Sequence, residues 1–227
     1  MEKQRIIQVY DNYMSDEKTL KKWSGNNLGN KFISEERYHL IRKLLVKYDI
    51  QLYNKKILEI GCAGGNIIPS LLKLGAIEEN IIGIDVRPDR LNDAKETYPD
   101  INFSYMDASE MDFAKNSFDI VTIFTLFSSI LNPKIRKQIA SEVYRVLKPN
   151  GVVLYYDFRY NNPVNQNVIG INKIEINSIF PDMNKTLKLV TVLPPISRVI
   201  GKMTPYLYPI LSTIPLLRSH YLGIFFK

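Results

Sequence analysis

From Lys55 onward, short runs of apolar β-forming residues alternate with segments whose apolar residues recur at helical spacing. The runs predict five buried strands, which are KKILEI, NIIGID, INFSYMD, SFDIVTIFTLF and GVVLYYDF. The helical segments between them are 66–75, which ends at Gly75, 88–98, which begins at Pro88, and 133–147, which follows Asn132. Strands that alternate with helices through short connections form a parallel sheet with helices on both faces.

The N-terminal part of the chain has a different pattern. Residues 2–23 predict irregular helical pieces, and a stronger helix is expected from Ser34, with Glu35 and Glu36 in its first turn. WSGNNLGNKFISEER would then be the segment that leads into this helix.

The C-terminal part predicts a hairpin of strands with a long connection. TLKLVTVL (186–193) and HYLGIFFK read as two strands, and the segment 194–218 between them is broken into short helical pieces by prolines. We therefore expect a single domain, with a helical cap in 1–54, a core in 55–160 and substrate-side elements in 161–227.

Composition sets limits on the class of protein. A chain of 227 residues with 45% apolar and 23% charged residues is typical of a globular protein that buries a core. The single Cys62 excludes a disulfide framework within the chain and any four-cysteine metal site, and no bound metal is expected. The first residues contain no apolar signal region and no apolar run reaches the ~18 residues of a membrane span, so a cytoplasmic protein is expected.

The net charge of +7 is unevenly distributed. Residues 1–56 hold 12 basic and 7 acidic residues, residues 57–150 hold 10 and 13, and residues 151–227 hold 8 and 3. No basic run with interleaved aromatic residues is present, so nucleic acid is not an expected partner. The basic flanks either attract a small anion or are scattered, solvated lysines.

The ends of the predicted strands carry the candidate chemistry. In parallel sheets, ligands bind beyond the carboxyl ends of the strands, where the strand order reverses. The residues at these ends are Glu59-Ile60-Gly61, Asp85, Asp107, Thr125 and Asp157-Phe158-Arg159.

A glycine-rich turn follows the first strand, in the stretch LEIGCAGGN (58–66). Glycine permits positive φ and has no Cβ, so the backbone can lie against a ligand. A dinucleotide fold requires G-x-G-x-x-G. Here Ala63 takes the place of the second glycine and Asn66 that of the third, so the match to that pattern is poor.

The order of four motifs resembles the class I S-adenosylmethionine-dependent methyltransferases over roughly residues 55–160. The motifs are LEIGCAGGN, GIDVRPDRL, YMDASEMDF and SFDIVTIFTLFSSI, followed by the turn and strand RVLKPNGVVLYYDF. The resemblance implies a Rossmann-like, doubly wound, seven-stranded sheet that is mostly parallel with an antiparallel last strand. It also implies S-adenosylmethionine as cofactor and S-adenosylhomocysteine as product.

The same resemblance assigns residues to the cofactor. Asp85 would accept both ribose hydroxyls, Asp107 would meet the adenine amino group, and Ala108 would contact the ring. The other cofactor contacts implied are Glu59, Gly61, Cys62, Ala63, Gly65, Val86 and Phe124, with Thr125 nearby. Two carboxylates suit these hydrogen-bond donors and tolerate a sulfonium, whereas they would repel a diphosphate.

The acceptor is expected beside DFRYNNP (157–163), which places an acid, a base and two amides at the mouth of the site. Asp157 and Arg159 are catalytic candidates, and Tyr160, Asn161 and Asn162 are substrate-binding candidates, although Asn-Asn-Pro also suits a plain turn. His220 competes with Asp157 as general base, and the alternative favoured over that role is a strand-end histidine whose hydrogen bonds are satisfied within the fold. It would start the last strand, either on the edge away from the carboxyl ends or near the cap.

Two further segments are candidates for covering the site. Segment 194–218 reads as a lid with Arg198 and Arg218 as anion contacts, and its rival reading is a membrane-facing patch, since it is apolar and carries only positive charge. In the N-terminal segment, Trp23, Asn30 and Arg37 either meet the cofactor carboxylate or the substrate, or belong to an ordinary loop.

We therefore expect methyl transfer to a small, anionic acceptor, and oxygen is favoured over nitrogen as the acceptor atom. The expected pathway is bacterial surface-glycan or secondary-metabolite synthesis. Two alternatives stay open: methylation of a lipid or quinone at a membrane surface, and a cofactor-binding protein without catalysis. The oligomeric state is not predicted.

Overall fold

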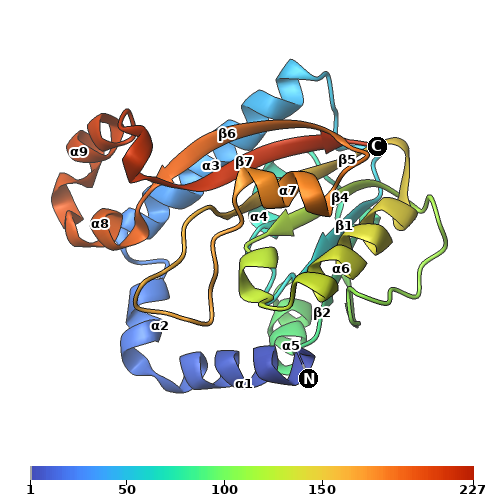
Figure 1. Ribbon diagram of the computed structural model, residues 1–227, viewed down its shortest axis with the longest axis horizontal. Coiled ribbons are helices and arrows are strands. Elements are labelled where there is room, and N and C mark those ends of the chain that lie inside the picture. The colour runs from blue at the N-terminus through green and yellow to red at the C-terminus, as the bar shows by residue number, and fades with distance from the viewer. Residues whose placement is uncertain (1) are drawn as a thin grey trace.

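A computed structural model describes residues 2–227 (Figure 1). Its seven strands form one sheet in the order β3-β2-β1-β4-β5-β7-β6. The first five strands pair in parallel, and β7 pairs antiparallel with both β5 and β6. The strands are β1 (Ile57–Ile60), β2 (Ile81–Asp85), β3 (Asn102–Tyr105), β4 (Phe118–Phe124), β5 (Leu147–Phe158), β6 (Asn184–Val192) and β7 (Arg218–Phe226). The expected mostly parallel sheet with an antiparallel last strand is confirmed.

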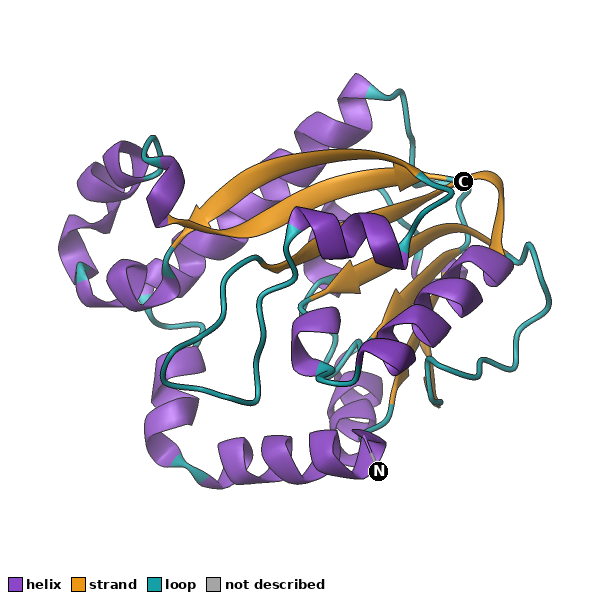
Figure 2. Ribbon diagram, in the orientation of Figure 1, coloured by secondary structure: helices purple, strands orange, loops and turns teal. Residues whose placement is uncertain are grey.

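Helices cover both faces of this sheet (Figure 2). They are α1 (Glu2–Ser15), α2 (Glu17–Trp23), α3 (Leu28–Lys47), α4 (Ile68–Lys73), α5 (Pro88–Thr97), α6 (Pro133–Val146), α7 (Lys173–Ile179), α8 (Pro194–Val199) and α9 (Thr204–Leu211). Helices α6 and α7 pack on one face, and α3, α4 and α5 pack on the other.

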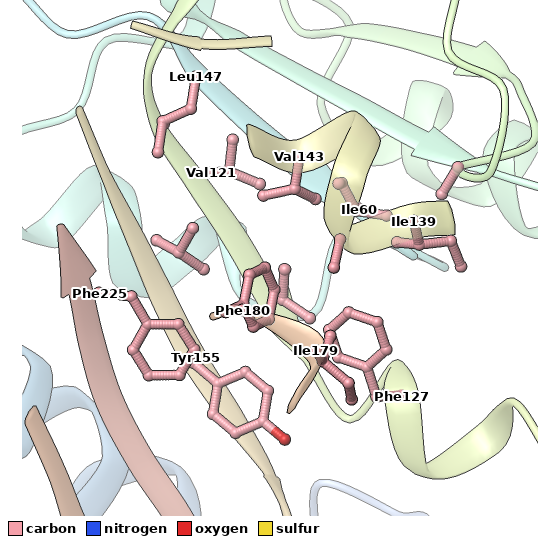
Figure 3. Packing of buried hydrophobic residues seen from close by; sticks show 14 of the residues in the cluster. Ile60, Val121, Phe127, Ile139, Val143, Leu147, Tyr155, Ile179, Phe180 and Phe225 are labelled. Carbon is pink, nitrogen blue, oxygen red and sulfur yellow. The ribbon is translucent and has the colours of Figure 1, made fainter. Parts of the chain in front are cut away.

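Strand β5 shows why the sheet needs both layers. Its side chains alternate between the two cores, with Val153 and Tyr155 on the face of α6 and α7 and Leu154 and Tyr156 on the face of α3. Tyr155 stacks on Phe225 with ring centroids 5.1 Å apart, in the core between the sheet and α7 (Figure 3). A central strand buried on both faces must be apolar throughout, as the sequence pattern indicates.

Helix α3 begins six residues earlier than expected. It starts at Leu28 rather than at Ser34, so the expected boundary was wrong. The side chain of Asn27 accepts a hydrogen bond from the backbone N–H of Asn30 and caps the helix. Gly29, which reads as a helix breaker in the sequence, lies inside the helix because its missing Cβ lets α8 approach closely.

The turn before β5 is part of the strand. The pattern Lys148-Pro149-Asn150-Gly151 was expected to separate α6 from β5, but β5 already begins at Leu147. The pairing with β4 shifts register between Phe118 and Ile120, and Asn150 has a φ of 63°. The turn signal therefore marks an irregularity inside the strand rather than a separate loop.

The strand order places the candidate site at the carboxyl ends of β1 and β4. β1 lies between β2 and β4, so successive crossovers leave it in opposite directions, and the helix layers part at this point. Helix α1 runs along this end of the sheet (Figure 1). Over residues 2–227, no helix combines the length and the apolar character required to pass through a membrane.

Candidate functional site

The turn after β1 is held tightly against β2. The backbone N–H of Gly61 donates to the carbonyl of Ile84 at 2.8 Å. Gly61 has a φ of 72°, and a Cβ at this position would lie 2.9 Å from Cδ1 of Leu126. Positive φ and this close approach both require glycine, so residue 61 is fixed by backbone geometry.

Asp85 at the end of β2 organises the glycine-rich turn. Its Oδ2 accepts the backbone N–H of Ala63 at 2.8 Å, and its Oδ1 accepts that of Arg87 at 2.9 Å. Burial raises the pKa of Asp85, while these hydrogen bonds act in the opposite direction. Ala63 has a φ of 46°, a conformation that the bond to Asp85 helps to hold. The sequence-predicted Asp85, Ala63 and Gly61 are therefore brought together.

Asp107 follows β3 by two residues and is held differently. Its Oδ1 accepts both the backbone N–H of Ser109 at 2.9 Å and the Ser109 hydroxyl at 2.7 Å. No hydrogen bond from residues 2–227 reaches Oδ2. Ala108 beside it is buried. The carboxylate thus keeps one oxygen for a donor from outside the chain.

Glu59 is the most deeply buried of the three carboxyl groups. Glu59 is 4% exposed, and its Oε2 has no hydrogen-bond partner among residues 2–227. Burial raises the pKa of Glu59 well above its usual range, and the cation of Arg37 opposes this shift. An unsatisfied buried acceptor of this kind is costly unless a ligand supplies the missing donor.

Arg37 of α3 brings a positive charge to the same region. Its guanidinium carbon lies 5.7 Å from the ring centroid of Phe124 and 5.4 Å from that of Tyr156. Its Nε is buried, and no described residue of the chain accepts a hydrogen bond from it. A cation in this setting is suited to an anionic group of a ligand.

Helix α1 contributes a residue that the sequence did not point to. The hydroxyl of Tyr10 lies 3.1 Å from Oγ of Ser129, and its ring lies beneath the guanidinium of Arg87. Burial raises the pKa of Tyr10, the Ser129 bond opposes this, and the carboxylates of Asp85 and Asp157 raise the pKa further. Tyr10 therefore lies between the segments that follow β2 and β4. The only signal in the sequence is the spacing of Tyr10 and Tyr13, which places both on one helix face.

Asp157 at the end of β5 is fully buried. Its Oδ2 accepts the backbone N–H of Ser128 at 3.1 Å, and its Oδ1 accepts that of Phe158 at 2.8 Å. Burial raises the pKa of Asp157 to about 6, although the bonds from Ser128 and Phe158 oppose the shift. The side chain joins the end of β5 to the segment after β4.

His220 lies at the carboxyl end of β5, where it pairs with Phe158. The alternative that placed it on the edge away from the carboxyl ends was wrong, because β7 runs antiparallel and lies between β5 and β6. The imidazole stacks on Tyr156 at 4.6 Å, and its Nδ1 lies 2.8 Å from Oγ of Ser219. Burial lowers the pKa of His220 to about 3, and the nearby cations of Arg37 and Arg198 lower it further.

The remaining polar candidates of 159–162 hold loops and the insertion in place. Arg159 donates from Nε to the carbonyl of Arg218 at 2.6 Å and from Nη2 to the carbonyl of Pro215 at 2.8 Å. The Tyr160 hydroxyl accepts a hydrogen bond from the same guanidinium, and Oδ1 of Asn161 accepts one from the backbone N–H of Gly170 at 2.8 Å. Asn162 accepts the backbone N–H of Val164 at 3.1 Å.

Arg198, Arg218 and Asn30 connect the insertion to the rest of the fold. Arg198 donates from Nε to Oδ1 of Asn30 at 2.9 Å, and Arg218 donates from Nη1 to the carbonyl of Leu189 at 3.0 Å. Trp23 packs edge-on against Tyr13, with centroids 5.3 Å apart. As substrate contacts, these residues stay predictions.

The chemistry of this site fits the expected cofactor. S-adenosylmethionine offers an ammonium group, a ribose diol, an exocyclic amine and a sulfonium, all of which are donors or positive charges. The site offers the orphan oxygen of Glu59, the free oxygen of Asp107 and the carboxylate of Asp85. The one anionic group of S-adenosylmethionine is its carboxylate, which suits the positive charge of Arg37. A diphosphate would meet three carboxyl groups instead.

Comparison with known proteins gives an independent result. Residues 57–151 match the family described as methyltransferase domain. A ubiquinone biosynthesis O-methyltransferase of Colwellia psychrerythraea is 33% identical over 108 residues, which is 45% of this chain and 42% of the relative. The ubiquinone/menaquinone biosynthesis C-methyltransferase UbiE of Rickettsia typhi is 29% identical over 160 residues, 62% of each chain. The chain thus spans about half the length of these curated relatives.

Solved structures show the same fold over nearly the whole chain. The PH0226 protein of Pyrococcus horikoshii OT3 superimposes with a TM-score of 0.64 at 18% identity, covering 96% of this chain and 98% of that one. A SAM-dependent methyltransferase of Archaeoglobus fulgidus gives a TM-score of 0.60 at 16% identity, covering 86% and 98%. Residues 57–151 are thus similar to methyltransferase domains, and over most of the chain the fold is that of a solved SAM-dependent methyltransferase.

Proposed function

We propose that the protein transfers the methyl group of S-adenosylmethionine to a small acceptor. The observation that supports this most directly is the set of three carboxyl groups around the glycine-rich turn. Glu59, Asp85 and Asp107 lie at the ends of neighbouring strands, and two of them keep oxygens without partners.

The roles that we propose follow from what each group still has to offer. Asp85 accepts the ribose hydroxyls with its remaining lone pairs, and Asp107 accepts the adenine amino group with Oδ2. Arg37 binds the cofactor carboxylate, because its buried guanidinium has a donor without a partner. Gly61, Cys62, Ala63, Gly65, Val86, Ala108 and Phe124 line the nucleoside.

For the acceptor, we propose an oxygen atom on a small aromatic acid or quinone precursor. The curated relatives named ubiquinone biosynthesis O-methyltransferase support oxygen and a quinone-related ring. Aromatic side chains gather at this end of the sheet: Phe124, Tyr156 and Phe158 lie next to Arg37 and His220. These groups favour an aromatic acceptor over the glycan that the sequence suggested.

Methyl transfer requires alignment of the acceptor and, for a hydroxyl, removal of its proton. Between the two candidate bases, Asp157 has the pKa nearer to neutrality, about 6, whereas that of His220 is about 3. We therefore favour Asp157 over His220 for this role. Arg159 positions the insertion through its bonds to Arg218 and Pro215.

The test is formation of S-adenosylhomocysteine from S-adenosylmethionine with a panel of catechols and hydroxybenzoic acids. We expect turnover with at least one of them. Asp107→Ala should lower kcat/KM by about ten- to a hundredfold, because one charge-assisted hydrogen bond contributes about 1.5–3 kcal/mol. Asp112→Ala, which removes an exposed carboxylate of the same segment, is the matched control and should leave kcat/KM unchanged.

A specific observation supports the rival, a cofactor-binding protein without methyl transfer. The [4+2]-cyclase SpnF shares this fold with a TM-score of 0.60 at 14% identity, so the fold accommodates other chemistry. Tight binding of S-adenosylhomocysteine together with no turnover across the panel and with cell extract would favour this rival.

A further inference from the structure

The insertion between β6 and β7 has an unusual outer surface. We define the apolar insertion surface as Val199, Met203, Tyr206, Ile210, Ile214 and Leu216, all exposed. Val199 is 84% exposed, Leu216 77% and Tyr206 71%. Among the exposed residues of 194–217, Lys202 is the only one that carries a charge. Exposure of several large apolar side chains on one short segment is typical of an interaction site.

Helix α9 has its polar bonds on the inside and its apolar side chains on the outside. Tyr208 is buried and its hydroxyl donates to Oε2 of Glu36 at 2.8 Å, while the Tyr208 hydroxyl oxygen accepts the backbone N–H of Val192. Tyr206 and Ile210 point away from this contact into solvent. A helix that only covers a core has the opposite arrangement, so the outer face of α9 is suited to contact an apolar partner.

The fold holds this surface in place. Gly29 of α3 lies so close to Ser197 of α8 that an added Cβ would be 2.1 Å from the Ser197 carbonyl oxygen. Arg198 bonds to Asn30, and Tyr208 bonds to Glu36, both on α3. The apolar side chains therefore cannot turn inward without breaking buried contacts.

The charges around the surface select the partner. Segment 194–218 contains Arg198, Lys202 and Arg218 and no acidic residue. The neighbouring α2 and the start of α3 add the exposed Lys22 and Lys31, on either side of Asn30, which bonds to both the Lys22 carbonyl and Arg198. Apolar side chains with tyrosine, on a segment whose charges are all positive, match the acyl boundary and the anionic headgroups of a lipid bilayer.

We propose that the apolar insertion surface docks the protein on a membrane that contains anionic phospholipid. The segment lies on the bilayer rather than crossing it. Arg159 bonds to the carbonyls of Pro215 and Arg218, so the surface is joined directly to the carboxyl end of β5. α8 and α9 project beside this end of the sheet (Figure 1). Docking thus brings the mouth of the site to the lipid headgroups, where a lipophilic acceptor is concentrated.

The experiment is co-sedimentation of the full chain with vesicles, without methyl transfer, so its result is independent of the proposed reaction. Vesicles of phosphatidylglycerol and phosphatidylcholine in equal parts should bind the protein, and pure phosphatidylcholine should bind it at least tenfold less. The double variant Tyr206→Glu/Ile210→Glu should lower binding to the anionic vesicles by at least tenfold. These side chains are exposed, so the variant should keep its thermal midpoint.

The matched control is Val46→Glu/Ile174→Glu, which places the same charges at apolar residues that are 74% and 82% exposed outside the surface. This control should bind as the unaltered protein does. Three outcomes would overturn the proposal: no binding to anionic vesicles, equal losses in both double variants, or a dimer in gel filtration that only Tyr206→Glu/Ile210→Glu dissociates, which would assign the surface to a second copy of the chain.

Discussion

The carboxyl groups of the site differ in how many hydrogen bonds they already accept from the backbone. Asp85 has both oxygens bonded to N–H groups, Asp107 has one, and Glu59 keeps a buried oxygen with no partner. Asp85 therefore shapes the turn, whereas the buried acceptor of Glu59 would be satisfied by a donor from a ligand. We accordingly expect a substitution at Asp85 to affect the conformation of the turn as well as the affinity for the proposed cofactor.

The raised pKa of the buried Asp157 makes the stability of the fold depend on pH. Its pKa is raised to about 6 in the folded protein, from 3.8. Between pH 4 and 6 the folded state binds more protons at this group than the unfolded state, so its contribution to stability falls as the pH rises. The loss is complete above pH 6 and amounts to about 3 kcal/mol, at 1.36 kcal/mol per pKa unit.

Asp157→Asn removes this titration. Urea unfolding at pH 4 to 7 should show the unaltered protein losing about 3 kcal/mol relative to Asp157→Asn as the pH rises. The lost acceptor for Ser128 or Phe158 adds an offset that does not vary with pH. A difference that stays constant from pH 4 to 7 would contradict the raised pKa.

At this scale, the sequence predicted where residues lie when their position is tied to a local motif, and their roles in binding stay predictions. The positions of Gly61, Asp85 and Asp107 follow from strand ends and glycine spacing. Tyr10 could not be found in this way, because it reaches the site from α1, and its neighbours Ser129 and Arg87 are 77 or more residues away. Such contacts depend on how α1 packs, which no local pattern encodes.

Among the elements, the contact between α3 and α8 decides whether the insertion is held against the rest of the fold. Gly29 permits that contact, since a Cβ would lie 2.1 Å from the Ser197 carbonyl oxygen. At an unobstructed helical position, glycine to alanine stabilises by about 1 kcal/mol. Here the backbone of α8 occupies the space that the methyl group needs, so the change from glycine to alanine should destabilise the protein.

We expect Gly29→Ala to lower the free energy of unfolding by about 1–3 kcal/mol, as overpacking does. Gly25→Ala is the control, because a Cβ there meets nothing within 4 Å. Urea denaturation compares the two. If Gly29→Ala proves as stable as Gly25→Ala, α8 does not lie against α3 as described.

The same contact explains why the start of α3 was misplaced. Asn-Leu-Gly-Asn reads as a turn, because glycine and asparagine favour turns when nothing else is known. In the fold, Asn27 caps the helix and Gly29 is selected by α8, which is 165 or more residues further along the chain. The strands of the core depend on local alternation and were predicted to within a few residues.

For the whole molecule, the order of elements determined the architecture. Five strands with intervening helices and a final hairpin lead to a parallel sheet with an antiparallel strand, and the strand order then puts the site at the β1–β4 switch point. The outer face of the insertion could not be read with the same certainty. From its sequence, the apolar segment was interpreted as a lid before a membrane contact, and the choice depends on which of its side chains are exposed.

The central claim is that the turn after β1 and the carboxylates of β2 and β3 bind the nucleoside of S-adenosylmethionine. Calorimetric titration of S-adenosylhomocysteine tests this most directly. We expect binding to the unaltered protein, a loss of about 1–3 kcal/mol in Asp85→Ala from the missing charge-assisted hydrogen bonds, and no loss in Asp93→Ala, an exposed carboxylate on the following helix. Equal affinity of Asp85→Ala and Asp93→Ala, or no binding to the unaltered protein, would contradict the account.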